Sequence, residues 1–150
     1  MNIEGSSNAD IMVHIIDYDE VPDSLFPFFT SYRIQFDPYI RCYGFFQARE
    51  LVAVAAVIPD ESDFQGGFQS VGCPIIYVFE VRTDLQLKGM GTKCARILVN
   101  NILNENTIQL CCISSIIPFW SKLGFEVRSF DQTFNYNKMI LIKEEDRGKD

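Results

Sequence analysis

A chain of 150 residues suits a single domain with its own core, since 47% of it is hydrophobic and 13 residues are phenylalanine. Its formal net charge of −7 argues against nucleic-acid binding, which uses a basic surface, and favours cationic partners. No stretch approaches the ~20 apolar residues of a membrane span. The five cysteines form no Cys-x-x-Cys pair and His14 is the single histidine, so the composition favours reduced thiols in a cytoplasmic or nuclear protein and no metal site.

Hydrophobic periodicity and turn residues divide the chain into strands and helices without a linker or repeat. In chain order we expect a strand at 11–16, a helix from about 24 to 36, strands at 40–48, 51–58 and 75–81, a helix at 90–103, a strand at 107–113, a short helix from about 116 to 123, and strands at 125–130 and 136–143. Asp37-Pro38 ends the first helix, Arg49-Glu50 forms a hairpin turn, and 59–72 is a polar loop. The pattern predicts one α/β domain over residues 1–150, with a disordered charged tail at 144–150.

The most informative stretch is the strand at 75–81 with the glycine turn and helix that follow it. Its sequence, IIYVFEV, is nearly all apolar or β-favouring, as in a strand buried on both faces. Gly89 and Gly91 lie where the next helix begins, and such a helix start leaves several backbone N–H groups unpaired and pointing one way. Glycines also let a ligand approach the backbone closely. The stretch therefore predicts a cradle for an anion such as a pyrophosphate.

Two common phosphate-binding motifs do not fit these glycines. The dinucleotide fingerprint needs a third glycine, where Cys94 stands, and an acidic residue ~20 positions further on, for which Glu105 comes too early. The nucleotidase-type loop needs a longer glycine spacing before its Lys and Ser/Thr. Residues 81–91, VRTDLQLKGMG, resemble motif A of the GNAT superfamily of acyl-CoA-dependent N-acetyltransferases, and 86–92, QLKGMGT, is especially similar to its histone-acetyltransferase branch.

A second segment, 119–126, resembles motif B of the same superfamily. Its sequence, FWSKLGFE, has an aromatic pair, a short helix end and then Gly-Phe. Locally, Ser115 is expected to cap the helix, with Pro118 in its first turn and Gly124 at its end. The two motifs stand in the family's order, and the resemblance covers about residues 40–130. It implies a GNAT-like acyl-CoA N-acyltransferase fold, in which a mixed sheet of about six or seven strands is flanked by helices and splayed between its central parallel strands.

The resemblance also implies acetyl-CoA as cosubstrate, without a metal. Its pyrophosphate would lie on the backbone N–H groups of 87–92, and its pantetheine arm would pair with the exposed backbone of 81–83. Lys88 and Lys93 would either add charge near the phosphates or remain solvated. The residues expected to bind the cosubstrate are Val81, Arg82, Thr83, Gln86, Leu87, Lys88, Gly89, Met90, Gly91, Thr92, Ser115 and Trp120.

The implied reaction is direct attack of an amine on the thioester, which needs a proton donor for the departing thiolate. Many family members have a tyrosine as the second motif B aromatic, but this chain has Trp120, whose indole N–H is not a usable acid. Tyr43, Tyr77 and Tyr136 are the phenols that could substitute, and water is the other source. The donor therefore stays open.

Glu80 is the candidate general base, because it is the one carboxylate within the central strand and burial there raises the pKa of a carboxyl group. Its structural alternative is a pair with an arginine, such as Arg82 or Arg96, or a solvated place in a wet cleft. The histone-acetyltransferase branch has its base where this chain has Ile75. That difference counts against a histone substrate specifically.

We expect the acceptor to be the primary amine of a cationic molecule: a lysine side chain of a peptide or protein, a protein N-terminus or a polyamine. The acidic loop at 59–63 either steers such an acceptor or only aids solubility. One alternative is a GNAT-fold CoA-binding module with little turnover, marked by Trp120 and acting as an interaction or regulatory protein. Another is an unrelated α/β interaction protein with a structural glycine turn. A homodimer is compatible with the resemblance.

Overall fold

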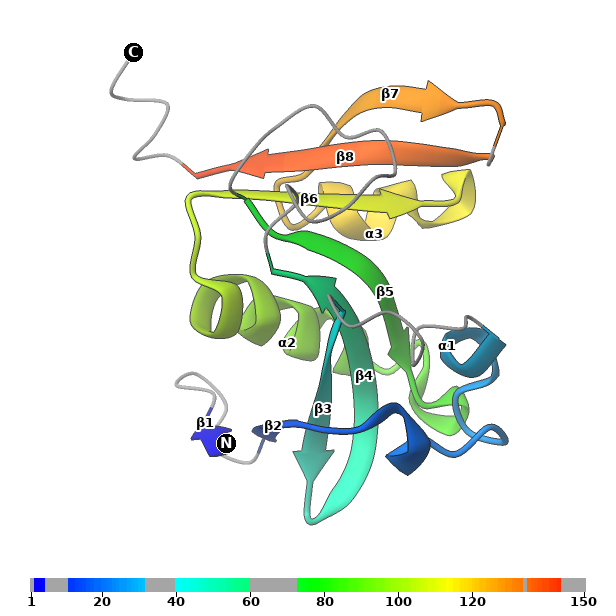
Figure 1. The fold of residues 1–150 in the computed structure, drawn as a ribbon, viewed down its shortest axis with the longest axis vertical. Coiled ribbons are helices and arrows are strands. Elements are labelled where there is room, and N and C mark those ends of the chain that lie inside the picture. The colour runs from blue at the N-terminus through cyan, green and yellow to red at the C-terminus, as the bar shows by residue number, and fades with distance from the viewer. Residues whose placement is uncertain (1, 5–10, 32–39, 60–72, 134, 144–150) are drawn as a thin grey trace.

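The computed structural model describes residues 2–4, 11–31, 40–59, 73–133 and 135–143. In these residues eight strands form one mixed sheet, in the order β1-β2-β3-β4-β5-β6-β8-β7 (Figure 1). The strands are β1 (Asn2–Glu4), β2 (Ile11–Ile15), β3 (Arg41–Gln47), β4 (Glu50–Ile58), β5 (Ile75–Val81), β6 (Thr107–Cys112), β7 (Glu126–Asp131) and β8 (Tyr136–Ile142). The predicted α/β class and mixed sheet are confirmed. The strand that the sequence did not indicate is β1, whose three residues are too few to display a period.

Three α-helices are present in the described part of the chain: α1 (Pro27–Ser31), α2 (Met90–Ile97) and α3 (Ile117–Ser121). A π-helical segment, Leu98–Leu103, continues α2, so the helix expected at 90–103 is confirmed over its length. The first helix is shorter than expected where it is described, and residues 32–39 lie outside the described ranges. The same holds for the acidic loop, apart from Pro59, and for the tail at 144–150.

Two local predictions are wrong by one or two residues. The hairpin turn consists of Ala48 and Arg49, both with positive φ (51° and 71°), while Glu50 already begins β4. A two-residue hairpin loop favours such left-handed residues, but neither Ala nor Arg indicates this conformation in a sequence. Ser115 does not cap α3, because it lies inside a 3₁₀ turn, Ser114–Ile116, that follows β6, and α3 has no side-chain cap.

The sheet forks between its two central parallel strands. β5 and β6 are paired only at Ile75↔Gln109 and Ile76↔Leu110, after which they diverge (Figure 1). On its other edge β5 pairs antiparallel with β4, and the register shifts there, with Ala56 opposite Val78 and Val57 opposite Ile76. Tyr77 is therefore the extra residue of a β-bulge. Because a bulge bends its strand and increases its twist, it turns β5 away from β6 at the point where their pairing ends.

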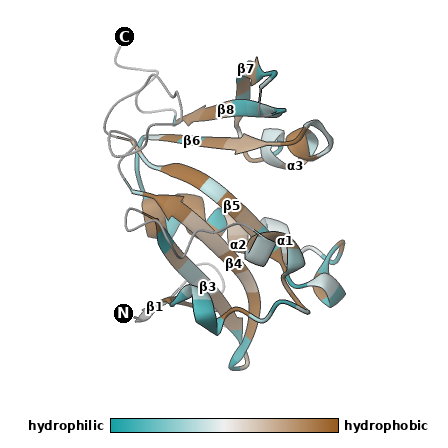
Figure 2. Ribbon diagram, turned by 45° about the vertical axis from the view of Figure 1, so that its right-hand side comes forward, coloured by the Kyte–Doolittle hydropathy of each residue, from teal (hydrophilic) through white to brown (hydrophobic). Residues whose placement is uncertain are grey.

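The two faces of the sheet carry separate parts of the core. One cluster packs α2 and α3 against the sheet and includes Leu98, Leu110 and Trp120. The second lies under α1 and includes Phe26, Phe29 and Val78. Figure 2 shows hydrophobic residues along the central strands and hydrophilic ones at the tip of the β3–β4 hairpin. No helix in the described ranges is long and apolar enough to cross a membrane.

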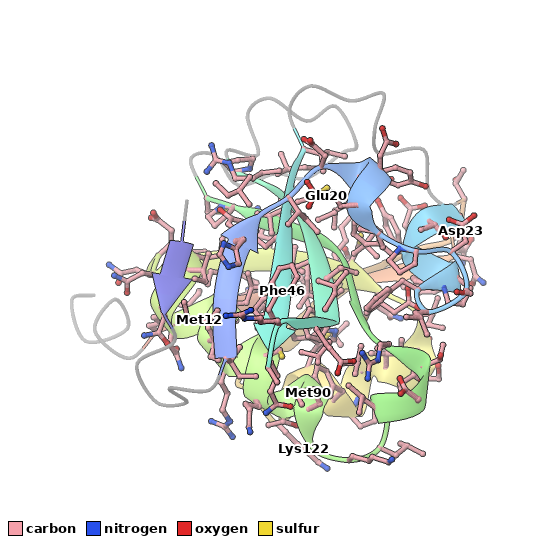
Figure 3. All side chains as sticks on the ribbon, turned by 90° about the horizontal axis from the view of Figure 1, so that it is seen from below. Met12, Glu20, Asp23, Phe46, Met90 and Lys122 are labelled. Atoms are coloured by element: carbon pink, nitrogen blue, oxygen red, sulfur yellow. The ribbon has the colours of Figure 1, made fainter. Side chains whose placement is uncertain are left out.

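Figure 3 shows the two sides of the sheet from below. Met90, at the start of α2, and Lys122, just after α3, lie on one side. Glu20 and Asp23, in the segment that leads to α1, lie on the other. The fork therefore has a helix-covered side formed by α2 and α3 and a second side, bordered by α1, with acidic residues nearby. We call these the α2–α3 side and the α1 side.

Candidate functional site

The predicted anion cradle lies at the end of β5, on one arm of the fork. After β5 the chain makes a 3₁₀ turn, Thr83–Leu85, and α2 then begins at Met90. Gly89 is the N-cap residue in a left-handed conformation (φ 84°), and no side chain caps the helix. The backbone N–H groups of the first turn of α2 are thus left to a ligand or solvent, and the helix dipole favours an anion there.

The two cradle glycines serve different purposes. A Cβ on Gly89 would meet no atom within 4 Å, so this position needs glycine for its positive φ and not for space. A Cβ on Gly91 would lie 3.2 Å from Val81 Cγ2 and 3.4 Å from Phe119 Cε1. Gly91 therefore allows α2 to approach β5 and α3 closely. This contact therefore fixes the start of α2, which forms the cradle, against the β5 arm of the fork.

Several backbone groups expected to bind the pantetheine arm already have partners inside the protein. The Gln86 side-chain amide donates to the Val81 carbonyl (Nε2···O 3.0 Å). The N–H groups of Arg82 and Thr83 donate to the carbonyls of Val52 (2.9 Å) and Leu25 (3.2 Å). A ligand that pairs with the Val81 carbonyl must therefore displace the Gln86 amide.

Arg82 is held by two carboxylates beside the cradle. Its guanidinium lies 2.7 Å from Asp84 Oδ1 and 3.1 Å from Glu50 Oε1. The hydrogen bond between Arg82 and Asp84 lowers the pKa of Asp84 and raises the pKa of Arg82. Arg82 is thus paired with neighbouring side chains, so positive charge for a bound phosphate would have to come from Lys88, Lys93 or the backbone N–H groups.

Leu87 is fully solvent-exposed and has a positive φ of 65°, an unusual combination for a leucine. Replacing Leu87 by glycine would remove no packing contact, because the side chain is exposed. It would relieve the roughly 1–2 kcal/mol that a left-handed conformation costs a residue with a side chain. We expect Leu87→Gly to raise the free energy of unfolding by about 0.5–1 kcal/mol, since glycine's greater freedom in the unfolded chain offsets part of the relief. Urea unfolding measures this, and Leu87→Val, β-branched at the same φ, should change the stability in the opposite direction.

Glu80 faces the α1 side, where it is 8% exposed. Its Oε1 accepts a hydrogen bond from the Phe29 N–H (2.6 Å) and its Oε2 one from the Phe28 N–H (3.3 Å), both at the start of α1. Burial raises the pKa of Glu80, and these two hydrogen bonds oppose the rise. Neither arginine alternative applies, because the carboxylate is bound to backbone N–H groups of a helix.

Trp120 lies in an aromatic cluster on the α2–α3 side of the fork, made of Phe79, Phe119, Trp120 and Phe125. Ring centroids are 4.9 Å apart for Phe119 and Trp120, 5.4 Å for Trp120 and Phe125, and 5.7 Å for Phe79 and Trp120. With 4% of its surface exposed, the indole is a packing residue. The cluster connects β5 to α3 beyond the last β5–β6 pair, so it occupies the side of the fork where a pantetheine arm is expected.

The candidate phenols and thiols are distributed over the strands around the fork. Tyr43 is buried, while Tyr77 and Tyr136 are partly buried. Burial, followed by the nearby Cys111, Asp131 and Tyr77, raises the pKa of Tyr136. Burial likewise raises the pKa of Cys111 to about 12. At neutral pH this thiol is protonated and is a poor nucleophile.

Asn137 is a buried polar residue at the end of the β6 arm that the sequence did not single out. Its side-chain amide donates to the Cys112 carbonyl (3.3 Å) and to Ser114 Oγ (3.0 Å), and so ties β8 to the turn that carries Ser115. Ser115 itself is exposed at the end of the β6 arm. The alternation along β8 places Asn137 on the buried face with Met139 and Leu141, and a polar residue in that register is the signal that could have identified it.

Solved structures that match this fold include acetyltransferases. The chain matches an IAA acetyltransferase from Bacillus cereus ATCC 14579 with a TM-score of 0.66 and 16% identity, over 89% of this chain and 99% of the other. It matches a GNAT family acetyltransferase from Elizabethkingia anophelis with acetyl-CoA bound with a TM-score of 0.63 and 12% identity, over 91% and 100%. The chain has the GNAT acetyltransferase fold. No family model and no curated protein matches the sequence.

A further GNAT-fold match is AAC(6')-Ib in complex with ribostamycin and coenzyme A, with a TM-score of 0.66 and 17% identity over 92% of this chain and 96% of the other. The forked sheet predicted from motifs A and B is thus part of a fold that other proteins use with CoA ligands. The described residues contain no group of three His, Cys, Asp or Glu side chains placed to hold a metal ion.

Proposed function

We propose that this protein is an N-acetyltransferase that transfers an acetyl group from acetyl-CoA to a primary amine by direct attack. The observation that carries the proposal is the fork, where β5 leaves β6 after Ile76 and then leads into the glycine cradle at the start of α2. A thioester ligand needs both an anion site for its pyrophosphate and a gap between strands for its arm. The structures of the same fold with acetyl-CoA or CoA support this assignment.

In this proposal the residues that bind the cosubstrate and the residue that acts as the base lie on different sides of the fork. Acetyl-CoA supplies an activated thioester carbonyl and a thiolate leaving group. The backbone of 87–92 binds the pyrophosphate, while the arm lies against Phe79 and the aromatic cluster. On the α1 side, Glu80 accepts the proton of the attacking amine as the N–C bond forms and the C–S bond breaks. The thiolate then takes a proton from solvent.

Direct transfer is favoured over an acyl-enzyme intermediate. Cys111, on the β6 arm just past the last β5–β6 pair, is the thiol nearest in register to the fork. Because burial raises its pKa to about 12, it is almost entirely protonated at neutral pH and lacks the thiolate that acyl transfer to cysteine requires.

The acceptor we propose is cationic: a lysine side chain, a protein N-terminus or a polyamine, met in the cytoplasm. The segment leading to α1 carries exposed carboxylates at Asp17, Asp19, Glu20 and Asp23. Of these, Glu20 and Asp23 lie on the side of the sheet that Glu80 faces (Figure 3). Together with the net charge of −7, they favour the approach of a positively charged amine.

The proposal is tested by melting the full chain with and without excess acetyl-CoA, with desulfo-CoA as a control. A ligand at 100-fold its dissociation constant stabilises a fold by about 2.7 kcal/mol, which should raise the Tm by several degrees. Release of free thiol with spermidine or a lysine peptide then measures turnover. A folded protein whose Tm does not change with acetyl-CoA would rule out both binding and catalysis at this site.

A second candidate function is a CoA-binding module with little turnover. Trp120 favours it, because a buried indole stands at the motif B position where many family members have the tyrosine acid. If a missing acid limits the rate, Trp120→Tyr should raise thioester turnover at saturating acetyl-CoA several-fold, at a stability cost of about 1–3 kcal/mol for the smaller ring. Trp120→Phe, which lacks the hydroxyl, is the matched control. Equal rates in both variants would show that solvent supplies the proton efficiently.

A further inference from the structure

A pocket of about 300 Å³ lies on the α2–α3 side of the sheet, at the end of the molecule away from the cradle. Its walls come from three elements that are distant in sequence. The helix that begins with α2 contributes Arg96 and Asn100, the turn after α3 contributes Leu123 and Gly124, and the end of β8 contributes Leu141 and Lys143. The volume is at the lower end of the ~300–1,000 Å³ typical of ligand pockets, so it suits a small molecule.

The charged side chains that line this pocket are all positive. Arg96 and Lys143 contribute the charge, and no acidic residue is among the lining residues. Within the described ranges, neither of them forms an ion pair with a carboxylate. In a protein of net charge −7, a pocket whose charged lining residues are both cations is a local exception, and it favours an anion.

A hydrogen bond to the backbone of the helix holds Lys143 in place. Its ammonium donates to the Val99 carbonyl (Nζ···O 3.3 Å), which uses one of its three N–H groups. Val99 belongs to the π-helical segment, whose wider turns change the backbone hydrogen bonding and often occur at functional sites. The head group is therefore positioned at the pocket with donors to spare, while Arg96 presents a planar guanidinium from the preceding turn of the helix.

Apart from Asn100, the other side chains that line the pocket are apolar. Leu123 is packed against the core cluster on the α2–α3 side, Leu141 belongs to that cluster, and both line the pocket. Gly124 has a φ of 101°, and a Cβ there would lie 3.0 Å from Leu141 Cδ1. The glycine that ends α3 thus also keeps this wall free of a side chain.

We propose that this pocket binds a small organic carboxylate with a short apolar body, the carboxylate between Arg96 and Lys143 and the apolar part against Leu123 and Leu141. The site is independent of the proposed acetyl-CoA site, which lies at the other end of the same helix. Arginine binds carboxylates through two parallel hydrogen bonds, and the apolar walls add affinity for each buried CH₂.

The test uses the ¹⁵N-labelled full chain titrated with sodium hexanoate at constant ionic strength, followed by amide NMR shifts. We expect saturable shifts at Asn100, Leu123 and Gly124, a dissociation constant at least tenfold weaker in Arg96→Gln, and no change in Arg128→Gln, a matched exposed arginine on β7. Lys143→Gln should weaken binding as well. Saturating acetyl-CoA should leave the hexanoate affinity unchanged.

Four results of the titrations without acetyl-CoA would overturn the proposal. They are the absence of saturable shifts, equal affinities in Arg96→Gln and Arg128→Gln, equally tight binding of hexylammonium, and saturation by inorganic phosphate but not by hexanoate. Displacement of hexanoate by acetyl-CoA would also contradict it, because it would assign the probe to the cosubstrate site. The outcome does not depend on whether the protein turns over a thioester.

Discussion

Glu80→Gln is expected to lower amine acetylation by about 10²–10⁴-fold and to remove the acid limb of the pH–rate profile. The wild-type carboxylate must be ionised to accept the amine proton. Its burial raises its pKa, against two opposing hydrogen bonds from Phe29 and Phe28, so the rate should fall as pH drops through this raised value. Glutamine keeps the shape of the side chain but cannot take the proton. Steady-state rates from about pH 5 to 9 measure both effects.

Glu105→Gln, at an exposed glutamate after the α2 helix, is the matched control and should leave the profile unchanged. A purely structural Glu80 predicts a different result for the main variant. Its contact with the start of α1 would be weakened and the rate would fall at every pH, but the acid limb would remain. That result would exclude Glu80 as the base and identify it as a positioning residue for α1.

The stability of Glu80→Gln relative to the wild type should change with pH in a defined direction. The folded-state pKa of Glu80 is raised above its ordinary value of 4.5. Its contribution to stability is therefore fully present below that value and is lost as pH rises through the folded-state pKa. The free energy of unfolding of Glu80→Gln relative to the wild type should accordingly increase over this window. Urea titrations on both sides of it measure the change.

Gly91→Glu should abolish acetyl-CoA binding, with a loss of at least 100-fold in affinity, or about 2.7 kcal/mol. A Cβ at this position would lie 3.2 Å from Val81 and 3.4 Å from Phe119, so the longer side chain forces apart the close contact of α2 with β5 and α3 that shapes the cradle. Its negative charge in the first turn of α2 would also repel the phosphates. Isothermal titration calorimetry with acetyl-CoA measures the loss.

Two controls separate charge from local conformation. Val127→Glu places the same charge on an exposed position of β7 and should bind acetyl-CoA normally. Gly89→Ala has open space for its Cβ but a φ of 84°, so it should lower stability by about 1 kcal/mol and retain binding. Normal binding by a folded Gly91→Glu protein would exclude the cradle as the pyrophosphate site.

Much of the fold follows from local pattern. The buried strand at 75–81, the helix from Met90 and the glycine end of α3 are each indicated by a period or a turn residue, and each is present at about its predicted bounds. The cradle also follows from sequence, because a strand, a glycine turn and a helix start are consecutive in the chain.

The sequence did not indicate the features that depend on partners distant in the chain. The bulge at Tyr77 depends on the register with β4, and the β3–β4 turn has left-handed residues that are neither glycine nor asparagine. For Glu80 the sequence left a pair with an arginine or a solvated place as the structural alternatives, whereas its carboxylate accepts from two N–H groups at the start of α1.

The sequence by itself determined the α/β class, the place of the cradle and the resemblance to an acyl-CoA-dependent family. The tertiary structure decided where β5 leaves β6, that Arg82 is bound by Asp84 and Glu50, and that Trp120 is buried among phenylalanines. It also brought Arg96, Gly124 and Lys143 around one pocket. Local order is encoded by neighbours in the chain, whereas hydrogen bonds, ion pairs and cavities form between segments whose distance in space the sequence pattern does not specify.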